Sequence, residues 1–304
     1  MGNAIATTIV VLLGLSLFYV AYRTVKGRPI ERRYVFIYIA FAVICPLFMN
    51  ITPPLPVTQD VRDLYNALEK LEPGSKVVAA FDYDPPSAPE LQPMAVAFMK
   101  YAFKHDLKVI IMGLWPQGPQ LATQAVEEAM RDPEVAAKKL EYGKDWVNLG
   151  FQSGNEFVIL SMGTQFERMF PRDERGTRYR DIPMLANVTN FNNIDFVFNL
   201  SSGKPGTIEW VQVAVDRFGA TLGAGNTAVQ APQVYPYLRA GQLHGLLGGM
   251  SGAAEFEKIV EERGQASTFL LSQIFAHATV ILFVIIGNAA FFTENRKQQI
   301  HAGR

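Results

Sequence analysis

The sequence predicts an α/β protein in which three transmembrane helices accompany one large extracytoplasmic domain. The helices are predicted because residues 1–22, 34–51 and 266–293 contain no Asp, Glu, Lys or Arg, and a helix of about 20 mostly apolar residues spans a bilayer. The domain is predicted because the intervening residues alternate short apolar runs with amphipathic segments, which is typical of a three-layer, mostly parallel α/β sheet. We therefore expect two membrane helices in 1–51, the domain in 52–265, and the third helix with a basic tail in 266–304.

The basic residues near the apolar segments predict the orientation. One cluster lies in or beside the link between the first two segments, and a second cluster follows the third segment. Positively charged links remain in the cytoplasm, so the domain is expected outside it, in a multi-pass protein of the plasma or inner membrane. The clusters consist of Arg23, Lys26, Arg28, Arg32 and Arg33, and of Arg296, Lys297 and Arg304.

The second apolar segment is the shortest of the three. Residues 34–51 are close to the lower limit for a spanning helix, and Pro46 and Asn50 lie near its end. A re-entrant or interfacial helix is the alternative, and it would invert the topology.

Helices and strands alternate through the first half of the domain. Val61, Leu64 and Leu68 have helical spacing and predict a helix over 60–71, which Pro73 and Gly74 end. The pattern then predicts a strand at 77–81, a helix at 94–103, a strand at 109–112 and a helix at 121–130. Next come two apolar runs, 146–151 and 157–162, whose four-residue spacer predicts a β-hairpin that interrupts the parallel pattern.

The alternation resumes after this hairpin. We expect a strand at 196–200, a helix at 208–217, a short strand at 221–222, a turn through Gly223 and Gly225, a helix at 232–238 and a strand at 243–247. The last helix, 253–262, runs almost directly into the third apolar segment, with Gly264 as the break. This spacing suggests that the domain and the last membrane helix are mechanically coupled.

Two carboxylates are the leading ligand-binding candidates. Asp82 and Asp84 directly follow the first predicted strand, and ligands of open parallel sheets gather beyond the carboxyl ends of the strands. Such a pair could hold Mg²⁺ or act as nucleophile and acid. In the competing interpretation, the two side chains cap nearby backbone donors.

The segment from Phe81 to Pro85 resembles the Asp-x-Asp-x-Thr/Val start of haloacid-dehalogenase-like phosphatases. The resemblance implies a metal-dependent phosphatase, with Ser201 in a second motif. The sequence departs from that pattern, because Pro86 replaces the Thr or Val and the late acidic motif appears only as Asn226 and Thr227 among glycines. A divalent ion would lack ligands there. We therefore keep Ser201, Asn226 and Thr227 as ligand-binding candidates and assign no catalytic residue, metal, cofactor or family.

The charge and cysteine content argue against a nucleic-acid-binding protein and against a domain stabilised by disulfides. Lys and Arg number 28, as do Asp and Glu, but the basic ends leave twenty basic against twenty-six acidic residues in the domain. Nucleic-acid binding needs a basic face, so no nucleic-acid partner is expected. The single cysteine, Cys45, lies in the second apolar segment, so the domain depends on its core rather than on disulfides.

Five arginines between 168 and 180 form either a solvated mixed-charge loop or a contact for an anion, a lipid headgroup or a subunit.

The third apolar segment contains a polar face. Gln273, His277 and Asn288 have helical spacing, and polar groups in hydrocarbon seek partners. We expect this face to pack on another helix of the chain or on another subunit.

These features favour a binding or scaffold subunit of a membrane complex, whose partners are the lipid bilayer and other membrane-protein subunits or further copies of the chain. The alternatives are an extracytoplasmic metal-dependent hydrolase that uses Asp82 and Asp84, and a ligand sensor coupled to the last membrane helix.

Overall fold

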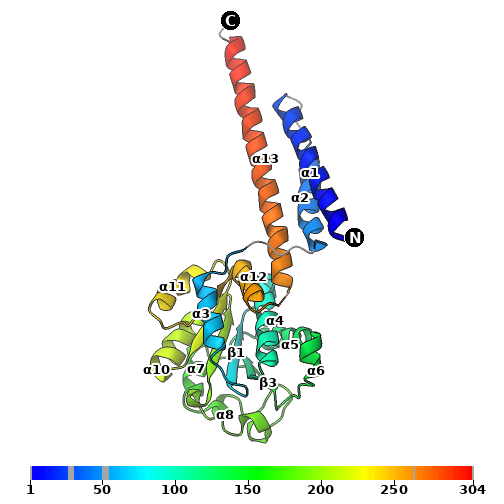
Figure 1. The fold of residues 1–304 in the computed structure, drawn as a ribbon. Coiled ribbons are helices and arrows are strands. Elements are labelled where there is room, and N and C mark those ends of the chain that lie inside the picture. The colour runs from blue at the N-terminus through cyan, green and yellow to red at the C-terminus, as the bar shows by residue number, and fades with distance from the viewer. Residues whose placement is uncertain (1, 27–30, 50–54, 263, 303–304) are drawn as a thin grey trace. The chain divides into compact units, whose positions relative to one another are not determined.

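The computed structural model describes residues 2–26, 31–49, 55–262 and 264–302. Arg28 and Arg304 of the basic clusters, and Asn50 of the second segment, lie outside the described residues. The chain forms two compact units (Figure 1). One is an α/β unit, Leu55–Ala266, and the other combines the residues before and after it.

The α/β unit contains a six-stranded sheet in which all neighbouring strands are parallel. The strand order is β3-β2-β1-β4-β5-β6, so the order reverses between β1 and β4. The strands read as continuous apolar runs because helices cover both faces. Their bounds are β1 Lys76–Asp82, β2 Lys108–Gly113, β3 Trp146–Phe151, β4 Phe196–Ser201, β5 Leu222–Asn226 and β6 Leu246–Gly248.

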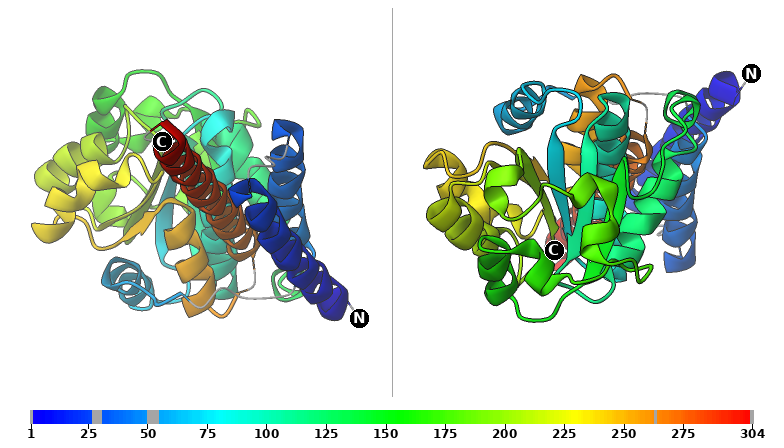
Figure 2. Two further views of the ribbon diagram at one scale, coloured as in Figure 1. Left: turned by 90° about the horizontal axis from the view of Figure 1, so that it is seen from above. Right: turned by 90° about the horizontal axis from the view of Figure 1, so that it is seen from below.

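Helices lie on both faces of the sheet (Figure 2). On one face, Val78, Ile110 and Val197 share a buried core with residues of α7, α9 and α11. Successive strand residues point to opposite faces, and on the other face Phe198 of β4 stacks on Phe98 of α4, with ring centroids 4.2 Å apart. The helices of this unit are α3 Gln59–Leu68, α4 Ala88–Lys104, α5 Gly118–Ala129, α6 Pro133–Ala137, α7 Glu156–Met162, α8 Phe166–Met169, α9 Thr207–Trp210, α10 Asp216–Phe218, α11 Ala231–Arg239 and α12 Gly249–Ile259.

The predicted β-hairpin is wrong. Its first strand exists as β3, but the second apolar run forms helix α7 and β3 pairs in parallel with β2. A short apolar run fits either a buried strand or a buried helix. The buried residues of α7 include Val158, Ile159 and Met162, whose spacing of one and four residues defines a helical face.

The predicted turn through Gly223 and Gly225 is also wrong, because both glycines lie inside β5 and are buried. Neighbouring side chains leave no room for a larger residue there. A Cβ at Gly223 would lie 2.5 Å from Leu64 Cδ1, and one at Gly225 would lie 2.6 Å from Leu200 Cδ2. These glycines serve close packing within a strand rather than a change of direction.

The second unit contains α1 Gly2–Val25, α2 Arg32–Leu47 and most of α13 Gln265–Ala302. Tyr38 of α2 packs edge-to-face on Phe283 of α13, with ring centroids 5.6 Å apart. Among the described residues, one helical stretch, Gln265–Thr293, is long and apolar enough to cross a membrane, whereas the apolar part of α2 is shorter. This supports membrane association by one helix, and the two further predicted spans stay proposals.

Candidate functional site

The sheet brings three of the predicted site residues to one level at its carboxyl edge. Asp82 ends β1 and pairs with Ser201, the last residue of β4, and Ser201 pairs with Asn226, the last residue of β5. This is the point where the strand order reverses. Ligands of open α/β sheets bind in the crevice outside such a point.

Asp82 is completely buried and receives three hydrogen bonds. Its Oδ1 accepts from the backbone N–H of Leu114 at 2.7 Å. Its Oδ2 accepts from Asn199 Nδ2 at 2.7 Å and from Trp210 Nε1 at 2.8 Å. Burial raises the pKa of the Asp82 carboxyl to about 7, and the nearby charge of Glu209 adds to this, while the three donors oppose it.

A second set of buried polar groups extends the site toward β5. Thr207 Oγ1 donates to Asn199 Oδ1 at 2.7 Å and accepts from Asn226 Nδ2 at 2.9 Å. Asn226 Nδ2 also reaches Gln230 Oε1 at 3.1 Å. We call Asp82, Asn199, Thr207, Trp210, Asn226 and Gln230 the edge network.

A loop closes over the edge network. Ser201 Oγ donates to the carbonyl of Gly203 at 3.1 Å, and Gln230 Nε2 donates to the same carbonyl at 3.0 Å. Trp115 Nε1 donates to the carbonyl of Pro205 at 2.8 Å. The donors and acceptors of the edge network are therefore satisfied by the protein itself, which favours a structural role for them in this conformation.

Asp84 makes none of these contacts, and Thr227 meets the edge network only through its backbone carbonyl. Asp84 is partly buried and accepts from Ser87 Oγ at 3.0 Å, so it is held by the turn that precedes α4. Thr227 begins the turn into α11, and its carbonyl accepts from the N–H of Gln230. The two carboxylates have separate partners, and within the described ranges no group of three or more His, Cys, Asp or Glu could hold a metal ion.

Sequence reasoning missed Asn199, Thr207, Trp210 and Gln230. Asn199 carried a usable signal, because it is a polar residue inside a run that is otherwise apolar from Phe196 to Leu200. A polar residue at such a position needs a buried partner. The other three come from helices or loops, and nothing in their local sequence indicates burial beside Asp82.

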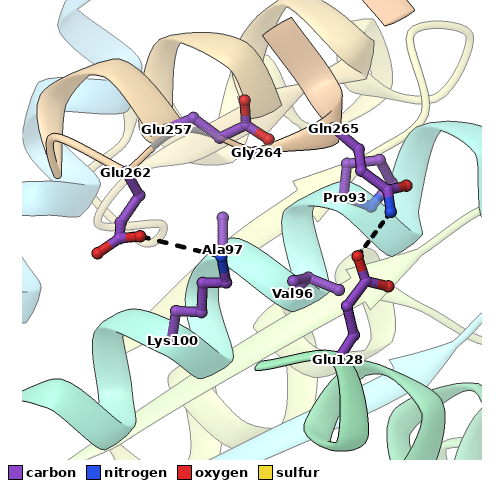
Figure 3. A pocket seen from close by; sticks show the side chains of 9 residues that line it. All are labelled: Pro93, Val96, Ala97, Lys100, Glu128, Glu257, Glu262, Gly264 and Gln265. Carbon is purple, nitrogen blue, oxygen red and sulfur yellow. Dashed lines mark hydrogen bonds and ion pairs between the residues drawn. The ribbon is translucent and has the colours of Figure 1, made fainter. Parts of the chain in front are cut away.

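Hollows also lie elsewhere in the described part of the α/β unit. A cavity of about 140 Å³ lies beside the end of α12 and the first turn of α13 (Figure 3). A cleft of about 440 Å³ lies along β3 and α5, where the Arg175 guanidinium stacks 3.5 Å from the centre of the Tyr142 ring. Arg180 pairs with Glu167 at 2.6 Å, and Arg172 donates to the carbonyl of Gly176 at 2.6 Å. At least three of the five loop arginines therefore make contacts within the chain.

The polar face of α13 is exposed. Gln273, His277 and Asn288 all have exposed side chains. The contacts of α13 lie on another face, where Phe283 packs on Tyr38 of α2 and Leu271 clusters with Met49, which follows α2. The partner expected for these three residues is thus not found within this chain's described helices, and contact with another subunit stays a prediction.

Fold and site together define a Rossmann-like α/β protein with a closed polar network at the switch point and one long apolar helix. Comparison of the chain with protein-family models, with curated proteins and with solved structures finds no match in any of the three.

Proposed function

We propose that the protein is a membrane-anchored binding or scaffold subunit, in which the α/β unit contacts a partner or small ligand and the apolar helices anchor it. The observation that supports this proposal is that the polar side chains at the switch point already bond to other groups of the protein. Asp82, the residue best placed for chemistry, is fully buried and already bonded to three donors. Catalysis by Asp82 would require breaking these contacts, whereas a binding role requires only the surface around them.

The rival function is a metal-dependent phosphatase that uses Asp82 and Asp84. The separate partners of the two carboxylates disfavour it, because an ion bound by both would have to displace Leu114, Asn199 and Trp210 from Asp82. The position of Asp82 at the switch point is the one feature in its favour.

The full chain purified in mild detergent tests the two functions. Native mass spectrometry would reveal co-purifying subunits or multiple copies, and a Mg²⁺-dependent assay with p-nitrophenyl phosphate would reveal turnover. The variant Asp84→Asn is suited to this test because Asp84 is only partly buried. We expect complexes and no turnover in either protein. Turnover that Asp84→Asn abolishes while assembly persists would establish the hydrolase instead.

We further propose that α1 and α2 cross the membrane with α13 and that the α/β unit is extracytoplasmic. The 24 residues of α1 correspond to about 36 Å of helix, enough to span the hydrocarbon layer. The basic residues beside these helices support cytoplasmic ends.

Cysteine labelling tests this topology. Cys45 is the only cysteine, so Cys45→Ala gives a background into which Ser153→Cys or Asn295→Cys can be placed at exposed positions. A membrane-impermeant maleimide should label Ser153→Cys in intact cells and Asn295→Cys only after lysis. The reverse pattern would overturn the proposed orientation.

A further inference from the structure

Helix α12 contains two buried carboxylates, Glu255 and Glu257, with 5% and 1% of their surface exposed. Burying a carboxylate is costly unless hydrogen bonds or ion pairs compensate it. The partners of both residues include groups near the ends of the α/β unit, where the chain connects to the apolar helices.

Glu255 accepts hydrogen bonds from Thr58, near the N-terminal end of the α/β unit. Its Oε2 accepts from the backbone N–H of Thr58 at 2.8 Å and from Thr58 Oγ1 at 2.6 Å, and its Oε1 accepts from Ser251 Oγ at 3.1 Å. Thr58 is the N-cap residue, directly before the first residue of α3. Lys258, one turn further along α12, donates to the carbonyl of Leu55. Residues 55–58 are therefore attached to α12.

Glu257 accepts a hydrogen bond from Ala266, at the C-terminal end of the α/β unit. Its Oε1 accepts from the backbone N–H of Ala266 at 2.8 Å, one of the N–H groups that the first turn of α13 leaves without a helical partner. This approach requires glycine at position 264, because a Cβ there would lie 2.1 Å from the same oxygen. Figure 3 shows the neighbouring contacts, in which Gln265 bonds to Glu128 at 2.6 Å and Glu262 pairs with Lys100 at 3.9 Å.

The N-terminal end of α12 packs against the loop at residues 227–230, which lies beside the edge network. Gly249, the first residue of α12, has φ +60°, and a Cβ there would lie 2.8 Å from Ala228 Cβ. Ala228 lies between Asn226 and Gln230, two members of the network, and its N–H donates to Glu90 at 2.8 Å. Between its ends, α12 is wedged against β6, since a Cβ at Gly252 would lie 2.8 Å from the carbonyl carbon of Leu247.

We propose that α12 transmits displacements of the loop at residues 227–230 to both chain connections of the α/β unit at once, through Glu255 at the entry and Glu257 at the exit. A ligand or partner that moved this loop would thereby change the constraint on both connections. The inference adds a route of communication to the proposed binding function, and it does not require that the ligand be known.

Hydrogen exchange measured by mass spectrometry on the full chain in detergent tests the route. The perturbing variant is Gly249→Ala, which adds a methyl group against Ala228. Its matched control is Gly241→Ala, because Gly241 also has a positive φ of +75° but nothing within 4 Å of a Cβ. We expect Gly249→Ala to accelerate exchange at residues 58–62 and 265–268 by about fivefold to tenfold, the scale of one weakened hydrogen bond, and Gly241→Ala to leave both segments unchanged.

A second variant perturbs the exit connection at Glu257, so the proposal can still be tested if Gly249→Ala does not fold. Coupling is reciprocal, so Glu257→Ala should accelerate exchange at 265–268 and also at 227–231, whereas Glu257→Gln, which keeps an acceptor oxygen, should have a much smaller effect. Changes confined to the mutated end in both Gly249→Ala and Glu257→Ala would overturn the proposal. Because no ligand or enzymatic assay enters the measurement, this result is independent of whether the protein is a scaffold or a hydrolase.

Discussion

Asp82 illustrates how one buried group affects stability over a range of pH. Its pKa is raised from 3.8 to about 7 in the folded protein, with burial as the main cause. The folded state therefore holds a proton that the unfolded state releases between these values. The resulting stabilisation is fully present below pH 4 and is lost as the pH rises through 7.

We predict that the free energy of unfolding of the wild type falls by up to about 4 kcal/mol from pH 4 to pH 7 relative to Asp82→Asn, which lacks the titrating group. The variant should also be less stable by about 1–3 kcal/mol at pH 4, because its amide NH₂ faces a donor. Trp115, Trp146 and Trp210 are the three tryptophans of the chain and all lie in the α/β unit, so their fluorescence can follow urea unfolding in detergent. Parallel pH curves for the two proteins would contradict the assignment to Asp82.

Two buried tyrosines differ in whether their hydroxyl group has a partner. Tyr83 donates to Gln92 Oε1 at 2.7 Å. The hydroxyl of Tyr101 is the one buried side-chain N or O atom without a hydrogen-bond partner in the described part of the chain. Removing an unsatisfied polar atom should stabilise the fold, whereas removing a satisfied one leaves its partner unpaired.

Tyr101→Phe is accordingly expected to raise the free energy of unfolding by about 1 kcal/mol, and Tyr83→Phe to lower it by a similar amount. Denaturant midpoints of the two variants, measured side by side with the wild type, test this. Equal signs for the two changes would show that the difference in hydrogen bonding does not control them.

At the scale of helices and strands, the sequence predicted most elements because their apolar patterns are local. Val61, Leu64 and Leu68 define α3, and the continuous apolar run of β1 marks a strand covered on both faces. The sequence-based prediction was wrong for α7 and for β5, because the contacts that decide their structure are with residues distant in the sequence. The glycines of β5 resemble turn residues until Leu64 and Leu200 are placed beside them.

The same limit applied to the site. Asp82 could be placed at the carboxyl end of a parallel strand because it directly follows a predicted strand, and the structure places Ser201 and Asn226 at the same edge. Whether that place is open or closed depends on Trp115 and on the loop that carries Pro205, which come from other parts of the chain. Neither is marked by a local pattern.

The contact between α5 and β1 depends on one glycine. A Cβ at Gly118, the first residue of α5, would lie 1.9 Å from the carbonyl oxygen of Phe81. Backbone cannot move aside as the end of a side chain can, so Gly118→Ala should lower the free energy of unfolding by about 3 kcal/mol or more. Gly248→Ala is the control, because the nearest atom to its Cβ would be 3.4 Å away. Equal stability of the two variants in urea would show that α5 can shift without cost.

For the molecule as a whole, the polar face of α13 connects the anchor to assembly. Gln273 and His277 are exposed on a helix whose stretch Gln265–Thr293 is apolar enough to cross a membrane. If that stretch is in the bilayer, these side chains gain hydrogen bonds only from another polar surface, and a second copy of the same face supplies one. Ser272 provides a contrast, since its hydroxyl already donates to the carbonyl of Thr268 in its own helix.

Replacing both Gln273 and His277 by Leu should therefore weaken self-association in liposomes by about threefold to thirtyfold, the range reported by measured interhelical hydrogen bonds. Ser272→Ala should leave it unchanged. Energy transfer between labelled copies, measured over a series of protein-to-lipid ratios, gives the association constant directly. If the double variant associates as well as the wild type, the polar face does not hold copies together, and its partner must be a different subunit. Native mass measurement of the complex would then identify that subunit, because a hetero-complex and a homo-oligomer of this chain differ in mass.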